Sequence, residues 1–105
     1  MEWIKIADSG AQLRDKVHEG TPQLLIVRQT RICLANLEGT FFAVHDKCTH
    51  NGESLSKGKV NYLGEVVCPW HGYRFAMKTG QCQGDAADLE TFPIKEDESG
   101  VYIGL

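Results

Sequence analysis

Two short segments of the chain each contain one cysteine and one histidine and end in a glycine. The first box is Cys48-Thr49-His50-Asn51-Gly52 and the second box is Cys68-Pro69-Trp70-His71-Gly72. Two thiolates and two imidazoles form a donor set that suits zinc or an iron–sulfur cluster. The two boxes are therefore a candidate metal centre.

The spacing within the boxes helps to choose between these metals. Structural zinc sites typically pair Cys with Cys and His with His at short spacing, whereas each box here mixes the two types. Seventeen residues separate His50 from Cys68. Mixed boxes can place all four ligands on one metal, or both Cys on one iron and both His on another. The second arrangement is that of a Rieske [2Fe–2S] cluster.

The pattern resembles the soluble Rieske-type ferredoxins that serve aromatic-ring-hydroxylating oxygenases. The resemblance rests on both boxes and on the run from Cys68 to Phe75, followed by Thr79-Gly80, and it covers most of the chain. It implies one [2Fe–2S] cluster, in which Cys48 and Cys68 bind one iron and the Nδ1 atoms of His50 and His71 bind the other. The Nε2 edges of both imidazoles would then face solvent.

The chain departs from the respiratory branch of that family at four positions. Where respiratory Rieske proteins have two further cysteines joined in a disulfide, this chain has Glu53 and Trp70. Where they have a serine and a tyrosine whose hydroxyls donate to cluster sulfurs, it has Tyr73 and Phe75. We therefore expect a reduction potential near the lower end of the Rieske range of roughly −150 to +300 mV.

Other residues of the boxes suit the support of a cluster. Gly52 and Gly72 allow tight backbone turns that point N–H groups at cluster sulfurs, and Pro69 stiffens the second box by fixing its φ. We expect Trp70 to cover the edge of the cluster or to add an apolar rim for docking. Cys33 and Cys82 lie outside the boxes and are predicted to pack as small apolar residues.

The rest of the chain predicts many short strands and one short helix, with Ser9 as its N-cap. The expected strands are 3–6, 24–27, 31–37, 40–45, 60–62, 65–68, 74–77, 92–95 and 101–103, and the expected helix is 11–17. This pattern indicates an all-β fold, an antiparallel β-sandwich or barrel. The resemblance adds that the fold is Rieske-like.

The length of 105 residues predicts a single domain, 1–105. Residues from about 46 to 84 contain three of the four Cys, two of the four His and six glycines. Short strands there bury little apolar surface, so the segment needs an additional stabilising cross-link such as disulfides or a bound metal. We expect it to be a cluster-binding insert in a β base formed by residues 1–45 and 85–105.

Composition excludes several other classes. A net charge of −3 argues against a nucleic-acid-binding protein, and no apolar run approaches the about 20 residues of a membrane helix. The first residues lack the basic start and apolar stretch of a secretory signal, so we expect a cytoplasmic protein. Cytoplasmic thiols stay reduced, which disfavours two disulfides among the four Cys.

The predicted function is electron transfer rather than catalysis. The chain would take one electron from a flavin-dependent reductase and pass it to a terminal oxygenase, as a monomer in transient contact with each partner. Only His18 and His45 remain outside the boxes, too few for a second, catalytic iron with two His and a carboxylate in so short a chain. Two alternatives are a Rieske-like small subunit of a nitrite reductase or another oxidoreductase complex, and a structural zinc module.

Overall fold

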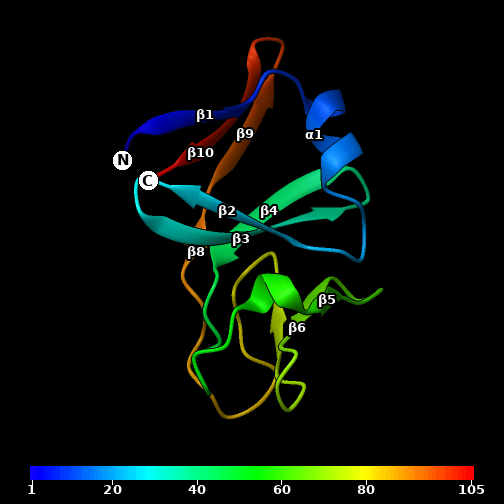
Figure 1. Ribbon diagram of the computed structural model, residues 1–105, viewed down its shortest axis with the longest axis vertical. Coiled ribbons are helices and arrows are strands. Elements are labelled where there is room, and N and C mark those ends of the chain that lie inside the picture. Colours follow the sequence, from blue (N-terminus) through cyan, green and yellow to red (C-terminus); the bar gives the residue numbers. More distant parts are fainter.

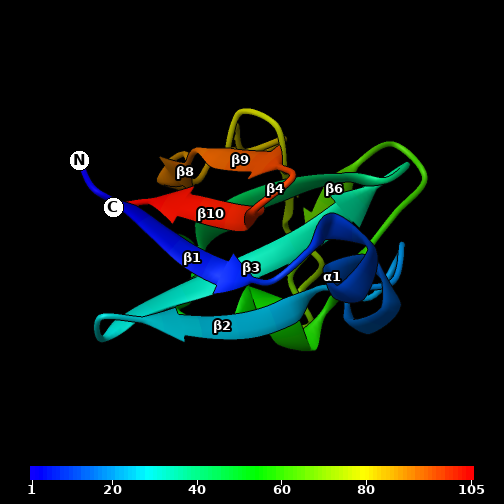
Figure 2. The same ribbon diagram turned by 90° about the horizontal axis from the view of Figure 1, so that it is seen from above.

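Two antiparallel sheets form one part of the molecule in the computed structural model, which describes residues 1–105. The first has the order β1-β10-β9 and consists of β1 (Trp3–Ala7), β10 (Gly100–Gly104) and β9 (Ile94–Asp97). The second has the order β2-β3-β4-β8 and consists of β2 (Gln23–Val27), β3 (Thr30–Leu37), β4 (Thr40–His45) and β8 (Thr91–Phe92). Figure 2 shows the first sheet lying over the second.

The N-terminal and C-terminal strands, β1 and β10, pair with each other in the first sheet. The N–H of Glu2 donates to the carbonyl of Leu105 at 2.7 Å, and the N–H of Leu105 donates back at 3.0 Å. The two termini consequently lie side by side (Figure 1). Helix α1 (Gly10–Lys16) follows β1, and the Ser9 side chain caps it by accepting the N–H of Gln12 at 3.0 Å, as predicted.

A third, smaller sheet lies below the other two (Figure 1). Its order is β5-β6-β7, formed by β5 (Lys59–Val60), β6 (Glu65–Val67) and β7 (Arg74–Ala76). A 3₁₀-helix, η1 (Leu55–Lys57), precedes it. No helix of the structure is long and apolar enough to cross a membrane.

Strand β3 is the boundary between two cores. Ile32 and Leu34 point into the core of the two larger sheets, whereas Cys33 and Ala35 point into the core of the smaller sheet. Successive side chains of a strand face opposite sides, so this nearly continuous buried strand supports both parts. The core of the smaller sheet is made by residues such as Leu55, Val66, Phe75 and Met77, together with Cys33, Ala35 and Val44.

The predicted all-β class with antiparallel sheets and one short helix is confirmed. The strand predicted over 92–95 is interrupted, because Pro93 has no N–H for the ladder and separates β8 from β9. The 3₁₀-helix was not predicted. The division into a base of 1–45 and 85–105 and an insert of 46–84 stays a prediction, although the smaller sheet falls within those insert bounds.

Candidate metal centre

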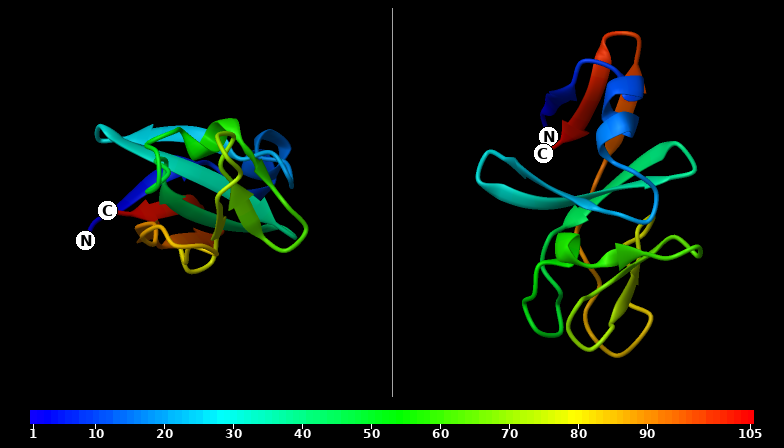
Figure 3. Two further views of the ribbon diagram at one scale, coloured as in Figure 1. Left: turned by 90° about the horizontal axis from the view of Figure 1, so that it is seen from below. Right: turned by 45° about the vertical axis from the view of Figure 1, so that its right-hand side comes forward.

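Both boxes lie at the end of the molecule farthest from the β9–β10 hairpin (Figures 1 and 3). The first box follows β4 and the second follows β6. Each loop is closed in the same way. The N–H of Cys48 donates to the carbonyl of Glu53 at 2.8 Å, and the N–H of Cys68 donates to the carbonyl of Tyr73 at 2.7 Å. Each cysteine therefore stands at the base of its loop and each histidine nearer the tip.

Burial separates the four candidate ligands into two pairs. Cys48 and Cys68 are each only 1% exposed, whereas His50 and His71 are exposed. The two imidazole centroids lie 6.3 Å apart, with their planes nearly perpendicular. No group of three or more His, Cys, Asp or Glu side chains converges as a single metal ion requires. Two sulfurs inside and two nitrogens outside fit a cluster that takes two ligands on each iron.

Burial raises the pKa of the Cys68 thiol, and the neighbouring Cys48 raises it further. Burial also raises the pKa of Cys33, which lies in the same core, and the charge of Asp46 adds to this effect. Cys82 is buried in that core as well. Cys33 and Cys82 therefore have the packing positions that were predicted for them.

The backbone of both loops depends on left-handed residues. Gly52 has a φ of +79° and Gly72 a φ of +70°, so the predicted tight turns at both glycines are confirmed. His71 also has a φ of +70°, a conformation that costs an L-residue about 1–2 kcal/mol. It is held there by the bond that closes the loop between Cys68 and Tyr73.

Trp70 stands beside the imidazole of His71. It is 58% exposed, and its ring meets that imidazole edge-on, with centroids 5.1 Å apart. Pro69 precedes it and is exposed as well. This placement suits an apolar rim around the candidate centre.

Besides the contact between the two imidazoles, the side chains of Asn51 and Tyr73 link the two loops. Asn51 donates to the carbonyl of Trp70 at 3.1 Å. The ring of Tyr73 stacks on that of His50, and its hydroxyl donates to Asp85 at 2.9 Å. This hydrogen bond, together with burial, raises the pKa of Tyr73. Thr49 donates to the carbonyl of Ala87, so the segment around residues 85–87 supports both boxes.

Asp46 anchors the base of the first box. Its side chain is completely buried, accepts the N–H of Ser56 at 2.6 Å and accepts the hydroxyl of Ser54. The guanidinium of Arg31 lies 3.5 Å away. Sequence reasoning assigned no role to Asp46, since a single aspartate after a strand carries no signal of burial. Asn51-Gly52 does carry a turn signal, but not the cross-loop contact.

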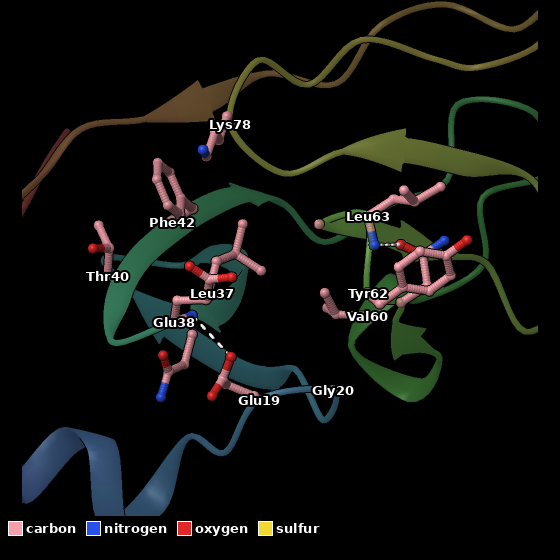
Figure 4. A pocket seen from close by; sticks show the side chains of 13 residues that line it. Glu19, Gly20, Leu37, Glu38, Thr40, Phe42, Val60, Tyr62, Leu63 and Lys78 are labelled. Atoms are coloured by element: carbon pink, nitrogen blue, oxygen red, sulfur yellow. Dashed lines mark hydrogen bonds between the residues drawn. The ribbon is translucent and has the colours of Figure 1, made fainter.

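The structure has one groove away from the boxes and one hollow beside the second box. A groove of about 680 Å³ separates the β3–β4 turn from the β5–β6 hairpin; Leu37, Phe42 and Tyr62 line it, and no residue of either box does (Figure 4). A second hollow, of about 550 Å³, is lined by residues that include His71, Tyr73 and Asp85. One face of the candidate centre is thus open to an approaching molecule.

Comparison with known families identifies the centre. The model of the Rieske [2Fe–2S] domain matches residues 3–93. The chain belongs to this family. The predicted Rieske-type [2Fe–2S] cluster is thereby confirmed, and the structural zinc module is not supported.

Named relatives agree with this assignment. The chain is similar to the 3-phenylpropionate/cinnamic acid dioxygenase ferredoxin subunit of Shigella boydii serotype 4 (strain Sb227), with 36% identity over 76 residues. The aligned region covers 70% of this chain and 72% of the relative. A solved complex of reduced oxygenase and oxidized ferredoxin in carbazole 1,9a-dioxygenase contains a chain with a TM-score of 0.81 and 25% identity, covering 96% of this chain and 100% of that one.

The ferredoxin of carbazole 1,9a-dioxygenase from Nocardioides aromaticivorans IC177 superposes with a TM-score of 0.84 at 18% identity, covering 99% of this chain and 98% of that one. At that identity the likeness shows the fold, and the predicted Rieske-like fold is confirmed. The prediction of an electron carrier is confirmed by the relative from Shigella boydii, which is named as a ferredoxin subunit.

Proposed function

We propose that this Rieske ferredoxin delivers single electrons to the terminal oxygenase of an aromatic-ring-hydroxylating system. The observation that carries the proposal is the contrast between two buried thiols, Cys48 and Cys68, and two exposed imidazoles, His50 and His71. A cluster held in this way would have its sulfur side in the protein and its imidazole side at the surface. The named relative and the solved complex of ferredoxin with oxygenase support the same kind of partner.

Within this proposal, Cys48 and Cys68 hold one iron, and His50 and His71 hold the other through Nδ1. The bound cluster supplies reversible one-electron chemistry. The neutral imidazoles leave the oxidised site with less negative charge than four thiolates would, which favours reduction. Their exposed Nε2 edges provide a short path to a docked partner, and water or the partner defines the hydrogen bonding of those nitrogens.

The remaining box residues have supporting roles. Gly52 and Gly72 turn the backbone so that N–H groups can face cluster sulfurs, which their positive φ values support. Pro69 restricts the second loop, and Trp70 forms the apolar rim beside His71. An exposed aromatic at this position suits a small, short-lived contact of less than roughly 1,200 Å².

The proposal includes a flavin-dependent reductase as the electron source and a monomeric protein that works in the cytoplasm. The net charge of −3 and the scattered exposed apolar side chains support a monomer without a nucleic-acid partner. Sedimentation equilibrium tests the oligomeric state. A dimer at micromolar concentration would contradict it.

The ligand set is tested by spectroscopy of purified protein. The wild type should be red-brown, contain two irons, and after dithionite reduction show the low average g value of a His-ligated [2Fe–2S] cluster. His50→Cys and His71→Cys should each abolish that signature, whereas His18→Cys, outside the boxes, should retain it. A wild-type signature that survives either box substitution would overturn the assignment.

The partner is tested by mixing the reduced protein with a purified aromatic-ring dioxygenase component, its substrate and oxygen. Rapid reoxidation of the ferredoxin together with product formation supports the proposal. Reoxidation only by another oxidoreductase, such as a nitrite reductase, would overturn the oxygenase assignment.

A further inference from the structure

Asn51 makes a side-chain hydrogen bond from the first box to the backbone of the second. Its Nδ2 donates to the carbonyl of Trp70 at 3.1 Å, across the gap between the loops. Its Oδ1 accepts the N–H of Glu53 at 3.0 Å within its own loop. The same Oδ1 lies 3.7 Å from the sulfur of Cys68. One side chain thus ties a local turn of the first box to the backbone of the second.

Direct links between the two loops are few, although the segment around residues 85–87 contacts both of them. No backbone–backbone hydrogen bond joins residues 48–53 to residues 68–73, and no disulfide joins any two of the four cysteines. The other contacts between the boxes are those of His50 with the rings of Tyr73 and His71. A cluster bound by one Cys and one His from each loop requires the two loops to keep one separation.

We propose that Asn51 is a positioning residue that clasps the two cluster loops at the separation the ligands need. The inference rests on the proposed ligand set. By hydrogen bonds, Asn51 joins the backbone of Glu53 in the first loop to the backbone of Trp70 in the second.

The clasp does not depend on the contact with Cys68. A cysteine that binds iron is a thiolate and has no proton to donate, so that contact is not a hydrogen bond in the loaded protein. The bonds to Glu53 and Trp70 use backbone groups and persist. The Trp70 carbonyl belongs to the peptide directly before His71, so holding it also holds the start of the left-handed turn at His71.

Two variants separate the clasp from the local turn. Asn51→Ser keeps a neutral side-chain oxygen that can accept the N–H of Glu53 but is too short to reach Trp70. Asn51→Asp keeps the acceptor and presents an oxygen, instead of an N–H, to the Trp70 carbonyl. Both remove the clasp, and only the second adds charge.

Asn61 provides a matched control. Its Oδ1 accepts the N–H groups of Leu63 and Glu65, and its Nδ2 donates to the Glu65 side chain, all within the β5–β6 hairpin. Asn61→Ser and Asn61→Asp therefore perturb the same kind of turn without touching the link between the boxes.

The measurements are the half-time of cluster loss to an excess of iron chelator and the EPR line width of the reduced protein. Both Asn51 variants should lose the cluster about fivefold faster than wild type, the factor expected for one hydrogen bond, and should show broadened EPR features. The Asn61 variants should match wild type in both measurements. Cluster loss so fast that an Asn51 variant is purified without iron, with wild-type circular dichroism of its strands, also supports the clasp.

Wild-type rates and line widths in both Asn51 variants would overturn the clasp. An effect of Asn51→Asp without an effect of Asn51→Ser would overturn it too, because charge and not the lost bond would then be responsible. Failure of the proposed ligand set is distinguishable, since the wild-type protein itself would then lack the Rieske EPR signature.

Discussion

The ring of Tyr73 lies flat on the ring of His50, with centroids 4.0 Å apart and planes 7° apart. His50 belongs to the first box, and Tyr73 directly follows the second. The hydroxyl of Tyr73 points to Asp85, to which it donates at 2.9 Å. The aromatic face of Tyr73 therefore packs against a proposed ligand, while its polar end is engaged with a carboxylate.

Tyr73→Phe should leave the reduction potential nearly unchanged. The substitution keeps the ring on His50 and removes only the bond to Asp85, so no donor to the cluster is lost. Tyr73→Leu, which removes the flat ring, should speed cluster loss and broaden the EPR signal. A large fall in potential for Tyr73→Phe would contradict this prediction, because it would mean that the hydroxyl donates to the cluster.

The wild-type reduction potential should lie in the negative part of the Rieske range of roughly −150 to +300 mV. Phe75 is completely buried and has no hydroxyl, and the Tyr73 hydroxyl is bound to Asp85. Neither position offers the donor to cluster sulfur that the respiratory branch has. Redox titration followed by EPR gives the potential, and a value well above zero would contradict the prediction.

Asp46→Ala should lower the free energy of unfolding by about 2 kcal/mol, since it leaves the N–H of Ser56 and the hydroxyl of Ser54 without their buried partner. Asp8→Ala is the matched control. The side chain of Asp8 forms only an exposed ion pair with Lys5, so its loss should cost less than about 0.5 kcal/mol. Urea unfolding followed by tryptophan fluorescence measures the free energy of unfolding of both variants. Equal losses in the two variants would show that the buried contacts of Asp46 do not stabilise the fold.

The ion pair between Arg14 and Glu96 should contribute to stability at neutral pH and lose that contribution in acid. Hydrogen bonding to Arg14 lowers the pKa of Glu96. Between this lowered pKa and the ordinary value of about 4.3, the unfolded state holds more protons than the native state. Stability from this pair therefore falls as the pH drops through that interval.

Glu96→Gln should consequently destabilise the protein at neutral pH and reduce its further loss of stability on acidification. Glu98→Gln is the control, since Glu98 lies two residues further on, in the β9–β10 turn, and forms no ion pair. Urea midpoints over a series of pH values measure the effect. A Glu96→Gln curve parallel to that of wild type down to acid pH would be inconsistent with the lowered pKa.

Removal of the cluster should loosen residues 46–84 while residues 1–45 and 85–105 keep their sheets. The two larger sheets have their own core, which includes Leu13, Ile32 and Val101, whereas the smaller sheet is short and lies next to the metal loops. Hydrogen exchange of the protein after chelation under reducing conditions tests this division. Simultaneous loss of protection along the whole chain would show that base and insert are one cooperative unit.

Local sequence signals were enough to predict most of the strands, the single α-helix and the candidate ligands. Alternating or β-branched segments predicted β2, β3, β4 and β10 to within one or two residues, because strand formation follows from side chains that face a core. The mixed boxes predicted a Rieske cluster because donor type and spacing are properties of the chain itself. Positive φ at Gly52 and Gly72 also follows from local sequence, since glycine tolerates that conformation.

Contacts between distant segments could not be predicted in this way. Nothing in the sequence places Asn51 against Trp70, Tyr73 against His50, or Asp46 beneath the first box. These contacts depend on how β4, β6 and the segment after β7 are packed around a shared core, which is a property of the whole chain. The sequence alone therefore determined the donor set and the strand-rich fold, whereas the tertiary structure decided which side chains hold the two loops together.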